Sequence, residues 1–205
     1  MAITTATAPY PVTVGNMYFG DLTLGDILKV EYARNVGISF IQTVQKIPGS
    51  GKITDIKSRI TGIDVTLASS RLPKSIVRKY RGQTVSTNKG FSAVNENDTF
   101  VSFAFGFTVK NSDQTSAFHW LPNCTMTENN SSYDTAPPEG ANDPVQDTKI
   151  SAIPDSDSGD ALITYDQSEV VAGKVPLTEE AFFAQVIKSM TDSIIDSETD
   201  VTPGT

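Results

Sequence analysis

The segment Val101 to Val109, Val-Ser-Phe-Ala-Phe-Gly-Phe-Thr-Val, decides the fold class of this chain. Successive side chains of a strand point to opposite faces, so this alternation of large and small residues predicts a β-strand with two different faces. One face should anchor a core and carries Val101, Phe103, Phe105, Phe107 and Val109. The other face holds small residues, which indicates close contact with another layer, a neighbouring subunit or a channel. The simplest interpretation is a central strand covered on both sides.

Further strands are predicted on both sides of this segment, so the expected fold is mainly β, an antiparallel β-sandwich or barrel-like domain. They span residues 12–19, 27–33, 37–47, 52–67, 116–121, 123–127, 145–153 and 161–166. Within residues 52–67 the alternation changes phase at Gly62, which favours a β-bulge. The turn cluster Pro48-Gly49-Ser50-Gly51 predicts a long hairpin over about residues 36–58 that projects from the domain.

Two helices are predicted against this β background. The first covers residues 72–81, with Pro73 in its first turn and Gly82 as its stop signal. The second covers residues 179–190, with Thr178 as its N-cap. Its apolar stripe should dock on the domain or on a neighbour and consists of Phe182, Phe183, Val186, Ile187 and Met190.

The ends of the chain are polar. We interpret residues 1–11 as an N-terminal arm, 12–190 as one β domain and 191–205 as a flexible acidic tail. No apolar run approaches membrane-spanning length, and the N-terminus lacks the regions of a signal peptide. We therefore expect no membrane partner.

Charge is distributed unevenly along the chain, whose formal net charge is −8. Residues 1–110 hold 13 Lys and Arg against 7 Asp and Glu, whereas residues 111–205 hold 3 against 17. An acidic chain is poorly suited to general nucleic-acid binding, because phosphate contacts need uncompensated cations. The division suits a protein that binds copies of itself, and the alternative is that the acids simply lie in loops and a tail.

Residues that usually carry catalysis are scarce. His119 is the single histidine and Cys124 the single cysteine, so we expect no catalytic Cys–His pair and no zinc site. A structural role is expected for His119, which lies beside Trp120 in a predicted strand. The acids of residues 155–160 alternate as in calcium loops but lack the downstream glutamate, and they predict a solvated turn. We expect no catalytic residue, no metal and no cofactor.

The order of several short motifs resembles a known family. A strand and a short Pro-started helix over residues 60–82 precede the aromatic strand FVSFAFGFTVKN, the return strand AFHWLPNCTMTENN and the acidic loop SSYDTAPPEG. The segments DTKISAIP, SGDALITYD and EEAFFAQVIKSM follow. Over about residues 52–195 this order is similar to that of the major tail protein, or tail tube protein, of long-tailed, non-contractile (siphovirus-type) bacteriophages.

The resemblance implies a structural virion protein, made in the host cytoplasm, with a tail tube β-sandwich fold and no enzymatic activity. Such a protein polymerises as stacked hexameric rings into the phage tail tube, which conducts the genome into the host. The implied partners are further copies of the chain and the tail terminator, distal tail and tape measure proteins. Double-stranded DNA would pass through without specific binding.

The predicted hairpin is the candidate inter-subunit site, and we expect it to reach a neighbouring copy in the adjacent ring. Its candidate contact residues surround the tip: Lys46, Pro48, Gly49, Lys52, Lys57 and Arg59. The acidic loop near residues 134–147 or the acidic tail of another copy would supply the opposite charge. The alternative is a monomeric β-sandwich binding module of the adhesin or carbohydrate-binding type, which would also explain the strands and polar loops.

Overall fold

The computed structural model describes residues 11–31, 33–49, 52–69, 72–83, 93–131, 146–170 and 174–189. Eight strands are present in these ranges: β1 (Pro11–Asp21), β2 (Ile27–Val30), β3 (Ala33–Gly49), β4 (Lys52–Ser69), β5 (Phe103–Asn111), β6 (Ser116–Ser131), β7 (Gln146–Ala152) and β8 (Ile163–Asp166). The mainly-β expectation is confirmed. The predicted arm before residue 11, the tail after residue 190 and most of the loop at 128–144 lie outside the described residues.

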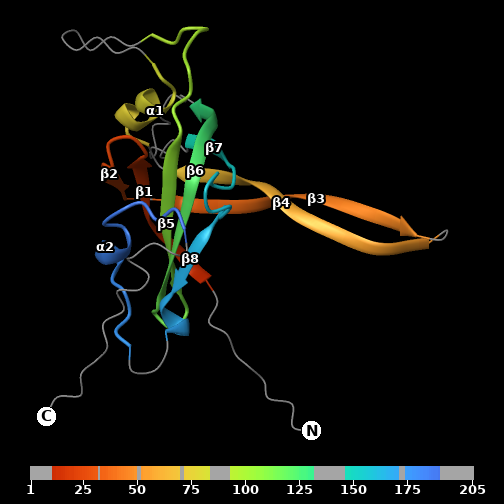
Figure 1. Cartoon of the computed structure of the whole chain (residues 1–205). Helices are drawn as coiled ribbons and strands as arrows, with labels where there is room; N and C mark the ends of the chain where they lie inside the picture. Colours follow the sequence, from red (N-terminus) through yellow and green to blue (C-terminus); the bar gives the residue numbers. More distant parts are fainter. Residues whose placement is uncertain are drawn as a thin grey trace, which may run out of the picture.

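The strands form one antiparallel sheet in the order β2-β1-β5-β6-β7-β4-β3, and β8 pairs with β6. The sheet is strongly twisted, so that β3 and β4 run across the direction of β5 and β6 (Figure 1). This curvature brings β3 into contact with β1, although the two strands are far apart in the order of the sheet. The described strands therefore form a partly closed, barrel-like sheet and not two separate sheets.

The concave side of the sheet holds the main core. Phe103, Phe105 and Phe107 of β5 are buried there, as the alternation predicts. The helix α1 (Lys74–Tyr80) closes one end through the buried residues Ile76 and Tyr80, together with Leu72 just before it. The predicted first helix is thus confirmed, although Pro73 caps it from outside its first turn.

The second side of β5 is covered by the chain itself. Residues 174–189, which we name the strap, pack on Ala104, Gly106 and Trp120. The sequence left three possible contacts for the small-residue face of β5: another layer, a neighbouring subunit or a channel. In the structure this face contacts another layer of the same chain. A Cβ atom on Gly106 would lie 2.6 Å from Cε1 of Phe183. This close approach explains why the face must be smooth.

The strap contains a shorter helix than predicted. Helix α2 spans only Glu179–Phe182, although the Thr178 side chain caps it as expected by accepting a hydrogen bond from the Ala181 N–H. Phe182, Phe183 and Ile187 are all buried on the sheet. Neighbouring residues of one helix point about 100° apart, so a helix that ends at Phe182 lets Phe182, Phe183 and Ile187 all reach the sheet.

Two strand predictions are also corrected. Val101 lies before β5 and is 41% exposed, because its N–H donates to the Tyr80 carbonyl at the end of α1 instead of joining a strand. The two strands expected at 116–121 and 123–127 form the single strand β6. A register shift between the Phe103–Cys124 and Phe105–Leu121 pairs accommodates Pro122 without ending the strand.

Candidate interaction surface

The β3–β4 hairpin extends well beyond the strands that hold its base. β4 pairs with β7 over Ile63–Ser69, whereas the pairing of β3 with β4 continues outward to Gly49 and Lys52. At about 3.3 Å per residue, the outer part of β3 from residue 41 spans about 30 Å. Figure 1 shows the hairpin leaving the body of the molecule on one side. A two-stranded ribbon is only marginally stable in water, so a partner surface would stabilise it.

One face of the hairpin continues the core of the domain. Even-numbered residues of β3 face the core at Val36 and Ile38, and the same alternation carries Phe40 and Val44 outward. Beyond the body, four large apolar side chains of this face are 41 to 60% exposed. We name them the apolar face of the hairpin: Phe40 (47%), Val44 (53%), Ile56 (60%) and Ile60 (41%).

A β-bulge places Ile60 on this apolar face. Ile41 pairs with Gly62 and Gln42 pairs with Ile60, so Thr61 is the extra residue of β4. A Cβ atom on Gly62 would lie 3.1 Å from the Ala152 carbonyl oxygen, which favours glycine there. The phase change predicted at Gly62 is confirmed. Without the bulge, Arg59 instead of Ser58 would lie opposite Val44.

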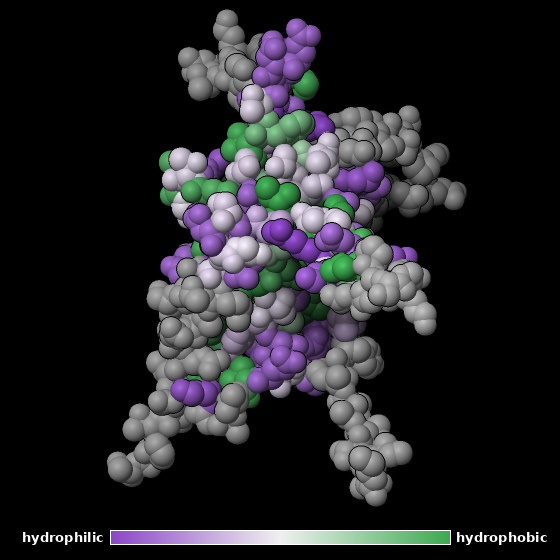
Figure 2. All heavy atoms as spheres, turned by 45° about the vertical axis from the view of Figure 1, so that its right-hand side comes forward, coloured by the Kyte–Doolittle hydropathy of each residue, from purple (hydrophilic) through white to green (hydrophobic). Residues whose placement is uncertain are grey.

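Basic residues surround the apolar face. Arg59 pairs with Thr43 and Lys57 with Gln45 on the opposite face, and Lys46 lies farther out. The side chains of Lys46, Lys57 and Arg59 are all exposed. Hydrophobic and hydrophilic residues lie side by side on the flank from which the hairpin projects (Figure 2).

The structure brings the predicted contact residues together on this hairpin. Pro48 pairs with Ile53 and Gly49 with Lys52, directly beside the turn. The tip residues 50 and 51 lie outside the described ranges. The role of these residues in subunit contacts stays a prediction. The apolar face was not predicted as a site, although the alternation of residues 36–44 contains its signal.

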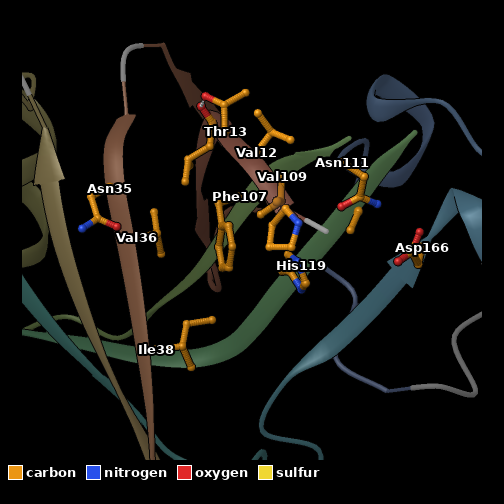
Figure 3. A pocket seen from close by; sticks show the side chains of 13 residues that line it. Val12, Thr13, Asn35, Val36, Ile38, Phe107, Val109, Asn111, His119 and Asp166 are labelled. Atoms are coloured by element: carbon orange, nitrogen blue, oxygen red, sulfur yellow. Dashed lines mark hydrogen bonds between the residues drawn. The ribbon is translucent and has the colours of Figure 1, made fainter. Parts of the chain in front are cut away.

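A cavity of about 600 Å³ lies where β3 crosses the open end of the sheet, and we name it the mouth (Figure 3). Val36 and Ile38 of β3 form one wall, and Phe107 and Val109 of β5 form the floor. Val12, near the start of β1, lies at its edge and is 61% exposed. The mouth was not predicted from the sequence, since its walls come from strands far apart in the chain.

His119 is a structural residue of the mouth, as expected. Its ring stacks on Phe107, with ring centroids 4.6 Å apart, and its Nδ1 lies 3.0 Å from Oγ1 of Thr164. Burial lowers the pKa of His119 to about 4, against a smaller opposing effect of the Asp166 carboxylate. The ring is therefore neutral at physiological pH. The Asp166 carboxylate accepts hydrogen bonds from the backbone N–H and the hydroxyl of Ser168. It accepts none from the His119 ring, so Asp166, His119 and Thr164 do not form a hydrogen-bonded catalytic triad.

Other side chains that could react or bind a metal have structural roles. Cys124 is fully buried, and burial raises the pKa of its thiol. The predicted turn at residues 155–160 is present, with Asp155 Oδ1 accepting from the backbone N–H groups of Asp157 and Ser158. Within the described ranges, no group of three His, Cys, Asp or Glu residues is placed to hold a metal ion. No helix of the described chain is long and apolar enough to cross a membrane.

Comparison with known proteins gives structural likeness only. No protein-family model and no curated protein matches the sequence. Among solved structures, a chain of the anti-feeding prophage baseplate, symmetrised sixfold, has a TM-score of 0.45 and 6% identity, covering 78% of this chain and 97% of that chain. The sheath–tube complex of PVC, an extracellular contractile injection system in its extended state, contains a chain with a TM-score of 0.42 and 16% identity, covering 77% and 93%.

A third similar chain comes from the tube-terminating cap of the anti-feeding prophage. It has a TM-score of 0.45 and 19% identity, and the match covers 81% of this chain and 99% of that chain. The assignment to non-contractile tails stays a prediction. We base the function proposed below on the residues of this chain.

Proposed function

We propose that this chain is a structural protein that assembles with copies of itself through the β3–β4 hairpin. The observation that carries the proposal is the apolar face, which continues a protein core into solvent on a ribbon about 30 Å long. Fully burying one large apolar side chain is worth roughly 1.5–3 kcal/mol. Covering Phe40, Val44 and Ile60 would therefore supply a substantial part of the free energy of a subunit contact.

In the finer form of the proposal, the assembly is the tail tube of a long-tailed, non-contractile phage, built from stacked hexameric rings. The order of sequence motifs supports this form. The net charge of −8 also supports it, because an acidic protein repels DNA phosphates and would let the genome pass without holding it. The tube would act without enzymatic chemistry, in contact with terminator, distal tail and tape measure proteins.

A shortened hairpin tests the proposal. Residues 42–61 are replaced by a two-residue turn, which removes Val44, Ile56 and Ile60 of the apolar face and leaves the part of β4 that pairs with β7. The wild-type chain should form rings or tubes in negative-stain microscopy, and the variant should sediment as a monomer with an unchanged thermal midpoint. Tubes formed normally by the variant would show that the hairpin is only a surface loop.

A matched pair of variants separates the two faces of the hairpin. The double substitution Phe40→Ser and Val44→Ser removes the apolar face, whereas Thr43→Ser and Gln45→Ser change the opposite face of the same strand. We expect the first pair to prevent assembly and the second to permit it. Wild-type protein that stays monomeric at all concentrations and salt conditions would favour the monomeric binding module instead.

A further inference from the structure

The mouth combines an apolar interior with an acidic surrounding. Phe107, Val109, Val36 and Ile38 line it from the inside. Asp166 lines its edge, at the end of β8. The mouth therefore offers apolar area beside negative charge, which differs from the apolar and basic character of the hairpin.

More acids lie at the same end of the sheet. Asp113 lies in the turn that joins β5 and β6, two residues after Asn111, which lines the mouth. Glu169 lies in the short 3-10 helix that directly follows β8. Lys110 is a cation near these acids and leaves the group of Asp113, Asp166 and Glu169 with a net negative charge.

We infer that the mouth receives the β3–β4 hairpin of a second copy of this chain. The apolar face around Val44 would lie against the apolar interior of the mouth. Lys46 pairs with Ile56 on the same face of that hairpin and would lie near the acids around Asp166, since opposite charges select the orientation of a contact. The inference rests on the proposed self-assembly and adds the surface that accepts the hairpin.

Hairpin and mouth are different surfaces of the same molecule, so the contact is heterologous. Each copy offers one hairpin and one mouth, and such contacts continue from copy to copy until they close a ring or form an open filament. The start of β3 forms a wall of the mouth, and the end of β3 forms the hairpin. A hairpin bound in the mouth of one copy therefore contacts the same strand, β3, whose other end reaches the next copy.

Single-cysteine variants test which surfaces meet. Cys124 is fully buried, so Val44→Cys on the hairpin and Val12→Cys at the mouth each add one accessible thiol. Leu24→Cys is the control, because Leu24 is 69% exposed in the β1–β2 turn, at the other end of β1. A short bis-maleimide should produce covalent dimers when the Val44→Cys and Val12→Cys proteins are mixed. It should produce none in either protein alone or when Val12→Cys is replaced by Leu24→Cys.

Cross-links within the Val44→Cys protein alone would show that hairpins meet each other, and would overturn the inference. Wild-type tubes without a cross-link between Val44→Cys and Val12→Cys would also overturn it, while leaving the proposed self-assembly intact. Absence of any wild-type assembly would instead contradict the proposed function itself.

A blocked mouth provides an independent test. Val12→Arg adds a cation where a basic hairpin should dock, and its side chain is exposed enough to leave folding unchanged. We expect this variant to stay monomeric and to form heterodimers when mixed with the Phe40→Ser, Val44→Ser protein, since each copy then supplies one intact surface. The control Leu24→Arg should assemble as wild type. Normal assembly of Val12→Arg would mean that the mouth takes another occupant or none, and would overturn the inference.

Discussion

Gly106 is a residue at which the sheet and the strap approach each other very closely. A Cβ atom there would lie 2.6 Å from Phe183 and 2.9 Å from Trp120. We expect Gly106→Ala to lower the free energy of unfolding by about 1–3 kcal/mol, because overpacking forces side chains and backbone to shift. Urea denaturation measures the change. Gly37→Ala is the control, since its nearest contact would be 3.8 Å away, and an equal loss there would contradict the steric explanation.

The Asp21 carboxylate should make the free energy of unfolding depend on pH. Its carboxylate accepts from Lys79 Nζ at 2.6 Å and from the backbone N–H groups of Thr23 and Leu24. The hydrogen bond from Lys79, with the backbone donors, lowers the pKa of Asp21 to about 2. Because this pKa is lower in the folded protein than in the unfolded chain, the ionised carboxylate stabilises the fold above about pH 4. That contribution is lost as the pH falls toward 2.

Asp21→Asn should therefore lower the free energy of unfolding by roughly 1–2 kcal/mol at pH 7. The difference from wild type should shrink as the pH falls from about 4 to 2, in urea titrations at each pH. Glu96→Gln, at an exposed position, is the control with little expected effect. A difference that stays constant across this range would show that the carboxylate charge is not responsible.

At the level of elements, the strap is attached by both apolar and polar contacts. Tyr18 and Phe183 stack with ring centroids 3.8 Å apart, and Glu179 accepts hydrogen bonds from Tyr18 and Asn16. We expect a chain that ends after residue 190 to keep the thermal midpoint of the full chain. A chain that ends before residue 174 exposes Trp120 and should unfold at a much lower temperature or aggregate.

Calorimetry of the two truncations distinguishes these roles. A large decrease for the chain ending after residue 190 would show that the following residues pack on their own domain. An unchanged midpoint for the shorter chain would show that the strap contributes little to the stability of the sheet.

The elements that the sequence predicts well are those with a strict local pattern. Strand alternation identified the β3–β4 hairpin, and the phase change at Gly62 identified its bulge. Pro73 and Gly82, as start and stop signals, identified α1. The length of α2 was wrong because its end depends on what Phe183 and Ile187 reach on the sheet, which is tertiary information.

The candidate surfaces were predictable to different degrees for the same reason. The basic residues of the hairpin are neighbours in the sequence, so they could be named in advance. The mouth needs Val12, Val36 and Val109 from three strands, and it exists only because the sheet curls until β3 meets β1. No local pattern contains that curvature.

At the scale of the whole molecule, the uneven charge predicts that assembly depends on salt. The Debye length falls from about 10 Å at 0.1 M salt to about 3 Å at 1 M, so attraction between exposed charges weakens. We expect the protein concentration at which assembly begins to rise several-fold over this range, as followed by light scattering. Replacing Lys46 by alanine should raise that concentration at low salt and reduce the salt dependence. If the concentration at which the wild-type protein assembles does not change with salt, the charges contribute nothing to assembly and the apolar face alone drives it.

The position of the strap in the chain has a consequence for folding during synthesis. Residues 174–189 leave the ribosome after all the strands that they cover. Tyr18, Phe118 and Trp120 therefore stay uncovered until late in translation. The nascent sheet then presents an aromatic surface that is prone to aggregation or to capture by chaperones. Docking of the strap therefore completes the fold, because it covers these aromatic side chains.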